Sequence, residues 1–102
     1  MEFIKNATSD GYEYFIKGKF TFSDNQKFKD ILEQTRNSPA SARFITIDLG
    51  ETEFMDSSAI GMLLLAKDEA KKHEKQVVIK NLQGQPKKIF DLSKLHEVFN
   101  VV

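Results

Sequence analysis

The chain has 102 residues, of which 40% are hydrophobic and 29% charged, and its fifteen basic residues balance fifteen acidic ones. This length and composition predict one globular domain over residues 1–102 and argue against disorder. A net charge of zero argues against a nucleic-acid or membrane partner, and the lack of cysteine excludes disulfides, thiol nucleophiles and thiolate metal sites.

The first part of the chain predicts a hairpin and a helix. Glu2–Thr8 is mildly apolar and residues 12–18 alternate, so we expect two antiparallel strands joined by the turn signal Ser9-Asp10-Gly11. Ser23 as N-cap, with Gln26 three residues later, matches a capping box that would start a helix. The helix would end at Asn37-Ser38-Pro39 and bury one face, comprising Phe28, Ile31, Leu32 and Thr35.

The remainder alternates strands and helices. Residues 43–49 predict a strand closed by Gly50, with Asp48 as its polar end. A second helix is expected from Ser57 or Ser58 to residues 73–75, followed by a buried parallel strand at 76–81. A third helix would have Pro86 in its first turn, with Ile89, Phe90 and Leu92 as its apolar residues, before a short turn at 94–98 and a last strand at 99–102. The order β-β-α-β-α-β-α-(α)-β predicts an α/β fold with a mixed, mainly parallel sheet.

Few residues in this chain suggest catalysis. Neither His73 nor His96 has a partner at metal-ligand spacing, and neither a phosphate-cradling glycine motif nor a nucleophile elbow is present. Asp48 could serve a phospho-accepting receiver, but the first strand lacks an acidic pair and no lysine follows the last strand. We therefore expect neither an enzyme nor a cofactor. With no visible signal peptide and no long apolar run, we expect a cytoplasmic protein.

Residues 54–65, Phe-Met-Asp-Ser-Ser-Ala-Ile-Gly-Met-Leu-Leu-Leu, differ from the rest. Asp56 and Ser57 are good N-cap residues, which leaves Ser58 in the first helical turn. A helical wheel puts Leu63 on the core face, whereas Ser58, Gly61 and Leu65 lie on the outer face with Leu64 at its edge. A hydroxyl beside exposed apolar surface is typical of a site for a protein partner.

This segment resembles the signature of STAS domains, the family of bacterial anti-sigma factor antagonists and sulfate-transporter tails. The family pattern is an apolar pair, Asp-Ser-Ser, Gly-Leu-Gly and a leucine run, and the resemblance extends over essentially the whole chain. It implies a STAS-like sheet with helices packed mainly on one face. Two positions depart from the pattern, because Ala59 replaces a glycine and Thr21 stands where many relatives carry an aspartate.

The resemblance implies a regulator that works by partner switching. The unmodified domain would bind an anti-sigma factor, often itself a serine kinase, and free a sigma factor. Phosphorylation at Ser58 would end this binding, and a serine phosphatase of the PP2C type would restore it. An accessory subunit of a membrane transporter, without a phosphorylation switch, stays open as the alternative. The partner-binding residues implied are Thr21, Asp56, Ser57, Ser58, Gly61, Leu64 and Leu65.

Overall fold

The computed structural model describes residues 1–102 and contains a five-stranded mixed sheet whose strands lie side by side in chain order. The first two strands pair antiparallel and the other neighbours are parallel, as the alternation of strands and helices predicts. The strands are β1 (Glu2–Thr8), β2 (Gly11–Phe20), β3 (Phe44–Met55), β4 (Gln76–Lys80) and β5 (Asn100–Val101).

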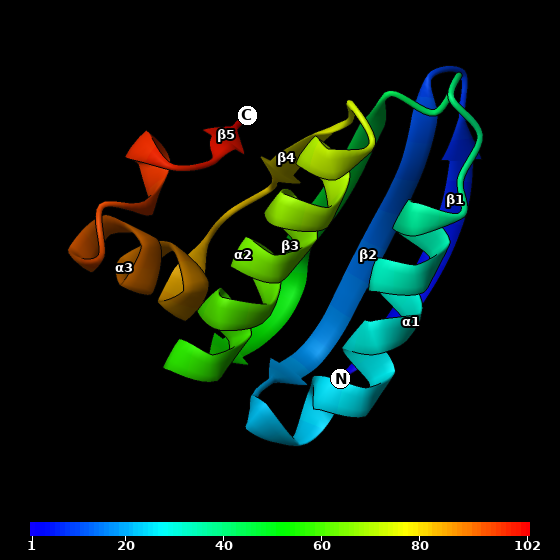
Figure 1. The fold of residues 1–102 in the computed structure, drawn as a ribbon. Coiled ribbons are helices and arrows are strands. Elements are labelled where there is room, and N and C mark those ends of the chain that lie inside the picture. Colours follow the sequence, from blue (N-terminus) through cyan, green and yellow to red (C-terminus); the bar gives the residue numbers. More distant parts are fainter.

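Three helices accompany the sheet: α1 (Asn25–Arg36), α2 (Ser57–Lys72) and α3 (Gly84–Leu92). Figure 1 shows α1 and α2 side by side over the same face of the sheet, while α3 lies beyond α2 toward the C-terminal part. Two short 3₁₀ turns, η1 (Phe22–Asp24) and η2 (Leu95–Glu97), precede α1 and follow α3. The expected α/β architecture is therefore confirmed. No helix combines the length and the apolar character that crossing a bilayer requires.

The core lies between the sheet and the helices, and each element contributes the residues that its own period predicts. Alternate residues of the strands point at the helices, whereas the helices bury positions three and four apart. Nineteen buried hydrophobic residues form one cluster. Its fully buried members include Tyr14, Ile16, Ile45, Ile47, Leu49 and Ile79 from the strands and Ile31, Ala59, Leu63 and Ala66 from the helices.

The predicted end of the third strand at Gly50 is wrong, because β3 continues to Met55. The register between β2 and β3 shifts at this point, which marks a bulge. Asp48 holds the bulge: its Oδ1 accepts from the Gly50 N–H and its Oδ2 from Asn81 Nδ2, each at 2.8 Å. Asp48 is thus a buried residue inside the strand rather than its polar end.

Two further local predictions are wrong. The capping box from Ser23 to Gln26 does not form, because α1 begins only at Asn25, after the η1 turn. That turn is closed instead by Asp24, whose Oδ2 accepts from the Thr21 N–H at 2.8 Å. Leu92, expected on the apolar face of α3, is 85% exposed because it is the last residue of that helix.

Candidate functional site

The carboxyl ends of the two central parallel strands bring the predicted site together. Phe20 at the end of β2 is the register partner of Met55 at the end of β3. Thr21 and Asp56, the residues that follow, therefore leave the sheet at the same edge. The N-terminus of α2 starts there, and the ends of parallel strands are where open α/β sheets carry their functional groups.

Asp56 organises this edge with both of its carboxylate oxygens. Its Oδ1 accepts from the Ala59 N–H at 2.9 Å and so caps α2. Its Oδ2 accepts from the Phe22 N–H at 3.1 Å and ties the η1 turn to the start of the helix. Asp56 is half-buried, and each of its carboxylate oxygens accepts one hydrogen bond from within the chain.

The structure departs from the expectation for Ser57 and agrees with it for Ser58. Ser57 does not precede the helix as a cap with its hydroxyl on a backbone N–H, because Asp56 is the N-cap and α2 begins at Ser57. Ser58 lies in the first helical turn, as predicted. Ser57 is exposed and Ser58 half-buried, and neither hydroxyl makes a hydrogen bond. No side chain accepts from either serine's backbone N–H, which leaves this end of the helix open to an anion.

Thr21 begins the turn that faces the serines. Its Oγ1 lies 3.0 Å from Ser23 Oγ, and its N–H is held by Asp24. Burial raises the pKa of the Asp24 carboxyl, but hydrogen bonds from the Met1 ammonium group at 2.6 Å and from Thr21 outweigh that effect and lower the pKa. Asp24 is therefore charged, and its hydrogen bonds hold the η1 turn in place.

The turn presents a residue that the sequence did not suggest as part of the site. Phe22 is 67% exposed, although aromatic side chains this large are usually buried. The strand expected from the sequence stops at residue 18, so Phe22 has no assigned place. The strand ends at Phe20, and η1 turns Phe22 outward beside Asp56.

A second residue missed from the sequence is Gln85, near the start of α3. Its side-chain amide donates to the Met55 carbonyl at 2.9 Å and accepts from the Met55 N–H at 2.8 Å. The amide thereby pairs with the end of β3 as a neighbouring strand would. A lone glutamine between Gly84 and Pro86 carries no sequence signal for this contact.

The exposure of the leucines along α2 agrees with the helical wheel. Leu63 is fully buried, whereas Leu64 is 36% and Leu65 54% exposed. Gly61 is exposed, and a Cβ built on it would contact nothing within 4 Å. The serines, Gly61 and the two leucines thus form a continuous exposed surface along α2, with Phe22 at its start.

The site offers groups for binding but no catalytic constellation. Nowhere in the chain do three His, Asp or Glu side chains gather as a metal site requires. Of the two histidines, His96 is paired with Asp91, at 2.7 Å, far along the chain from the serines. The Asp91 pKa is lowered by hydrogen bonds from Lys87 and His96.

Comparison with known proteins points to one family. Residues 4–102 match the family model described as "STAS domain". The "STAS-domain containing protein PA14_20770" of Pseudomonas aeruginosa is 33% identical over 96 residues, which cover 92% of each chain.

Solved structures share the fold. A putative anti-sigma factor antagonist from Thermotoga maritima superposes with a TM-score of 0.85 at 12% identity, over 97% of this chain and 84% of that one. The anti-sigma factor antagonist SpoIIAA in its unphosphorylated form gives a TM-score of 0.73 at 15% identity, over 99% and 87%. A sulfate transporter family protein from Wolinella succinogenes gives 0.72 at 14% identity, over 87% and 73%. At these identities the structural likeness defines the SpoIIAA-like fold alone.

Proposed function

The chain belongs to the STAS domain family, and on that premise we propose that it is an anti-sigma factor antagonist that works by partner switching. Its unphosphorylated form binds an anti-sigma factor that is also a serine kinase, and so frees a sigma factor. Phosphorylation of Ser58 prevents the binding, and a serine phosphatase of the PP2C type reverses it. The chain itself is not an enzyme and needs no cofactor, since ATP and Mg²⁺ belong to the kinase.

One observation carries this proposal: a serine pair at an open helix N-terminus is surrounded by exposed apolar side chains. Phe22 lies at the start of this surface and Leu65 about two turns along α2. Exposed aromatic and aliphatic residues of this kind supply most of the binding energy of protein interfaces.

The placement suits a switch that alters binding without unfolding the domain. A phosphoserine carries a charge of about −1.5 to −2 at neutral pH. The helix dipole and the unused N–H groups of Ser57 and Ser58 stabilise that charge within the chain. In the complex, the same phosphate would lie against apolar surface and close to Asp56. The phosphate therefore lowers the affinity for the partner rather than the stability of the domain.

Ser58 is the preferred acceptor because of its position on the helix. It lies seven residues before Leu65, so the two side chains share one stripe of α2. Ser57 is the more exposed of the two serines and is the competing acceptor. The likeness to a sulfate transporter family protein supports the second candidate, a transporter accessory subunit, for which modification of either serine would have no effect.

The experiment compares tagged wild-type protein with the Ser58→Ala, Ser58→Asp and Ser57→Ala variants in the native host. Captured proteins are identified by mass spectrometry, and the modified serine is mapped on the wild type. We expect the wild type and Ser58→Ala to retain an anti-sigma factor with kinase activity, and Ser58→Asp to lose it. Phosphate on Ser57 alone, or full binding by Ser58-phosphorylated protein, would refute the mechanism. Capture of a membrane transporter by all four proteins alike would favour the second candidate.

A further inference from the structure

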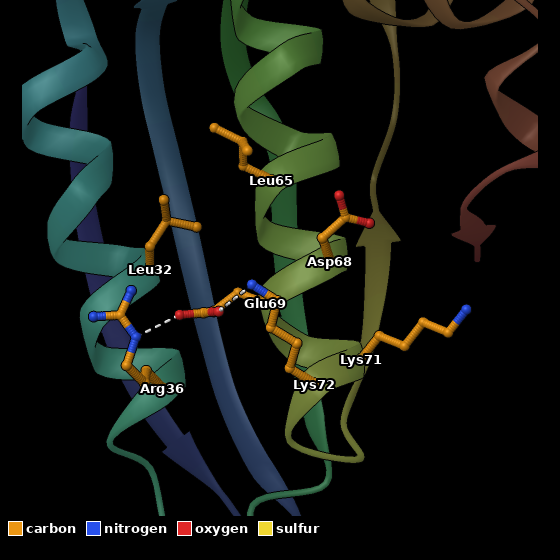
Figure 2. Close-up of a pocket in the computed structure, with 7 residues that line it drawn as sticks. All are labelled: Leu32, Arg36, Leu65, Asp68, Glu69, Lys71 and Lys72. Carbon is orange, nitrogen blue, oxygen red and sulfur yellow. Dashed lines mark hydrogen bonds and ion pairs between the residues drawn. The ribbon is translucent and has the colours of Figure 1, made fainter.

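A groove of about 600 Å³ runs between α1 and α2, on the face turned away from the sheet (Figure 2). Five of its seven lining residues are charged, which is unlike the mostly apolar lining of a small-molecule pocket. The groove therefore suits a protein segment. The residues that matter for its chemistry are Leu32 and Arg36 of α1 and Leu65, Asp68, Glu69 and Lys72 of α2.

Two matching stripes border this α1–α2 groove. Lys29, Leu32 and Arg36 follow one another along α1 at spacings of three and four residues, which places them on one side of the helix. Ser58, Leu65 and Lys72 follow at intervals of seven along α2. Each stripe thus has an apolar residue in its middle and a basic residue at the end away from Ser58.

The apolar middle is accessible. Leu32 is half-buried and Leu65 is 54% exposed, and Figure 2 shows the two leucines on facing sides of the groove. Covering this surface would remove apolar area from water, so an apolar side chain of a partner has a place to bind.

The charged residues that line the groove are three basic and two acidic, namely Arg36, Lys71 and Lys72 against Asp68 and Glu69. Glu69 is buried and already paired: its Oε1 accepts from Arg36 Nε at 2.5 Å, and Lys72 Nζ lies 3.9 Å from its Oε2. Figure 2 shows the Asp68 carboxylate pointing away from Arg36 and α1. Along the lining, basic residues therefore outnumber carboxylates by one, and one of the two carboxylates, that of Glu69, is already paired within the chain.

We infer that the α1–α2 groove receives an amphipathic acidic helix of the protein partner, an inference that rests on the proposed function. The apolar side of this helix lies over Leu32 and Leu65, and its carboxylates face Lys29, Arg36 and Lys72. The groove between two neighbouring helices is a geometry into which a third helix packs by ridges and grooves. The charge complementarity selects an acidic helix over a basic one.

This docking mode gives the switch an electrostatic component. Ser58 lies on the stripe of Leu65, about 10 Å away along α2. A phosphate there adds negative charge at the end of a groove that binds an acidic helix. The distance is close to the Debye length of about 8 Å at physiological ionic strength, so the repulsion weakens as salt rises.

The test uses three synthetic helical peptides that share one leucine seam and carry Glu, Lys or Gln on both flanks. Each peptide is titrated into the ¹⁵N-labelled full chain while amide shifts are followed. We expect the Glu peptide to bind about tenfold more tightly than the Lys peptide and to shift the amides of Leu32 and Leu65. Equal binding of all three peptides, or shifts centred elsewhere, would contradict the inference.

Matched variants separate the groove from the rest of the surface. Lys72→Glu should weaken binding of the Glu peptide about threefold to fivefold. Lys88→Glu, which changes an exposed lysine of α3, should leave that binding unchanged. Leu65→Asn should weaken binding of all three peptides, whereas Leu92→Asn, at the exposed end of α3, should not affect their binding. Thermal unfolding of each variant shows that it is folded, so equal effects of a groove variant and its control would overturn the inference.

The captured partner distinguishes this inference from the function on which it rests. If Ser58→Asp releases the partner while Lys72→Glu and Lys88→Glu bind it equally, the switch stands and the groove is not its docking site. If the Glu peptide docks as expected but no partner responds to Ser58, the groove stands and the switch is wrong.

Discussion

The carboxylate of Asp56 accepts a hydrogen bond from the backbone N–H of Phe22, a residue 34 positions earlier in the chain. The same carboxylate caps α2 through Ala59. One side chain thus sets both the start of the helix that carries the serines and the position of the exposed aromatic residue beside them.

Replacing Asp56 should therefore loosen two elements at once. We expect Asp56→Ala to lower the free energy of unfolding by about 1–2 kcal/mol, the usual cost of losing an N-cap. Amide hydrogen exchange at Phe22 should accelerate in the same variant. Asp68→Ala, an exposed residue of α2 in no ion pair, is the control and should change neither. Unchanged exchange at Phe22 in Asp56→Ala would show that the turn is held by other contacts.

Two leucines of α2 that lie two positions apart should respond very differently to truncation. Leu63 is fully buried and Leu65 is 54% exposed. Leu63→Ala should cost about 2–5 kcal/mol of stability, the range for a buried leucine. Leu65→Ala should cost less than about 1 kcal/mol but weaken binding to the partner. Urea unfolding of the two variants measures the difference, and similar losses would contradict the orientation of α2.

A negative charge at Ser58 should leave the fold intact. Ser58→Glu puts that charge near the positive end of the α2 dipole, whereas His73→Glu puts it at the C-cap. We expect Ser58→Glu to raise the free energy of unfolding or to change it by less than about 1 kcal/mol. We expect His73→Glu to lower the free energy of unfolding by about 0.3–1 kcal/mol. Thermal unfolding at low salt compares them. A large loss in Ser58→Glu alone would mean that phosphorylation acts by unfolding the site.

Gly61 offers a substitution in which stability and binding change in opposite directions. A Cβ added there meets no atom within 4 Å, and the residue lies inside α2 with no unusual backbone angle. Gly61→Ala should stabilise the domain by about 0.5–1 kcal/mol, because glycine is a poor helix former. Gly18→Ala is the contrasting control. Gly18 has a φ of +82°, which residues with a side chain rarely adopt, so this variant should be less stable than the wild type. If Gly61→Ala binds the partner with unchanged affinity, the partner does not approach this part of α2 closely.

Alkaline pH should weaken the fold through Tyr14. Burial raises the pKa of this fully buried phenol above its usual 10.0, and the neighbouring Tyr12 adds to the shift. The unfolded chain releases the Tyr14 proton near pH 10 while the folded chain keeps it, so stability falls as the pH rises above 10. Each pH unit beyond that point should cost about 1.4 kcal/mol.

Tyr14→Phe isolates this contribution. At pH 7 the variant should be less stable by about 1 kcal/mol, because it lacks the bond of 2.8 Å from the phenol to Gln34 Oε1. Urea unfolding at pH 7, 10 and 11 should show this deficit shrinking and then reversing. An unchanged deficit at pH 11 would mean that Tyr14 ionises in both states alike.

The sequence predicts the elements well because their residues carry the periods of their own structures. Ile45 and Ile47 alternate toward the core, and Leu63 and Ala66 repeat with the helical period. Neither the strand nor the helix therefore needs knowledge of tertiary contacts to be predicted. The serine pair at the start of α2 was likewise predicted from local signals.

The misses have a common physical origin in contacts between distant residues. Gly50 looks like a strand end, but Asp48 and Asn81 hold it in a bulge. Ser57 looks like a cap, yet the Asp56 carboxylate serves Ala59 and Phe22 together. Phe22 carries no local signal for its place beside the serines, because the contact that holds it there is with Asp56, 34 positions on. In each case the second partner, Asn81 for Asp48 and Phe22 for Asp56, lies more than 30 positions away, outside any window of a few residues.

The pairing of β2 with β3 also has a kinetic consequence. These parallel strands are joined only through α1 and its flanking loops, so their pairing closes a long loop and is expected to be a late step in folding. Thr21, Phe22 and Asp56 come together only when that pairing extends to Phe20 and Met55. A chain in which this pairing has not yet formed has the serines but not the surface around them. Under the function proposed above, the binding surface would form only with this pairing, so chains that have not yet folded would not compete for the partner.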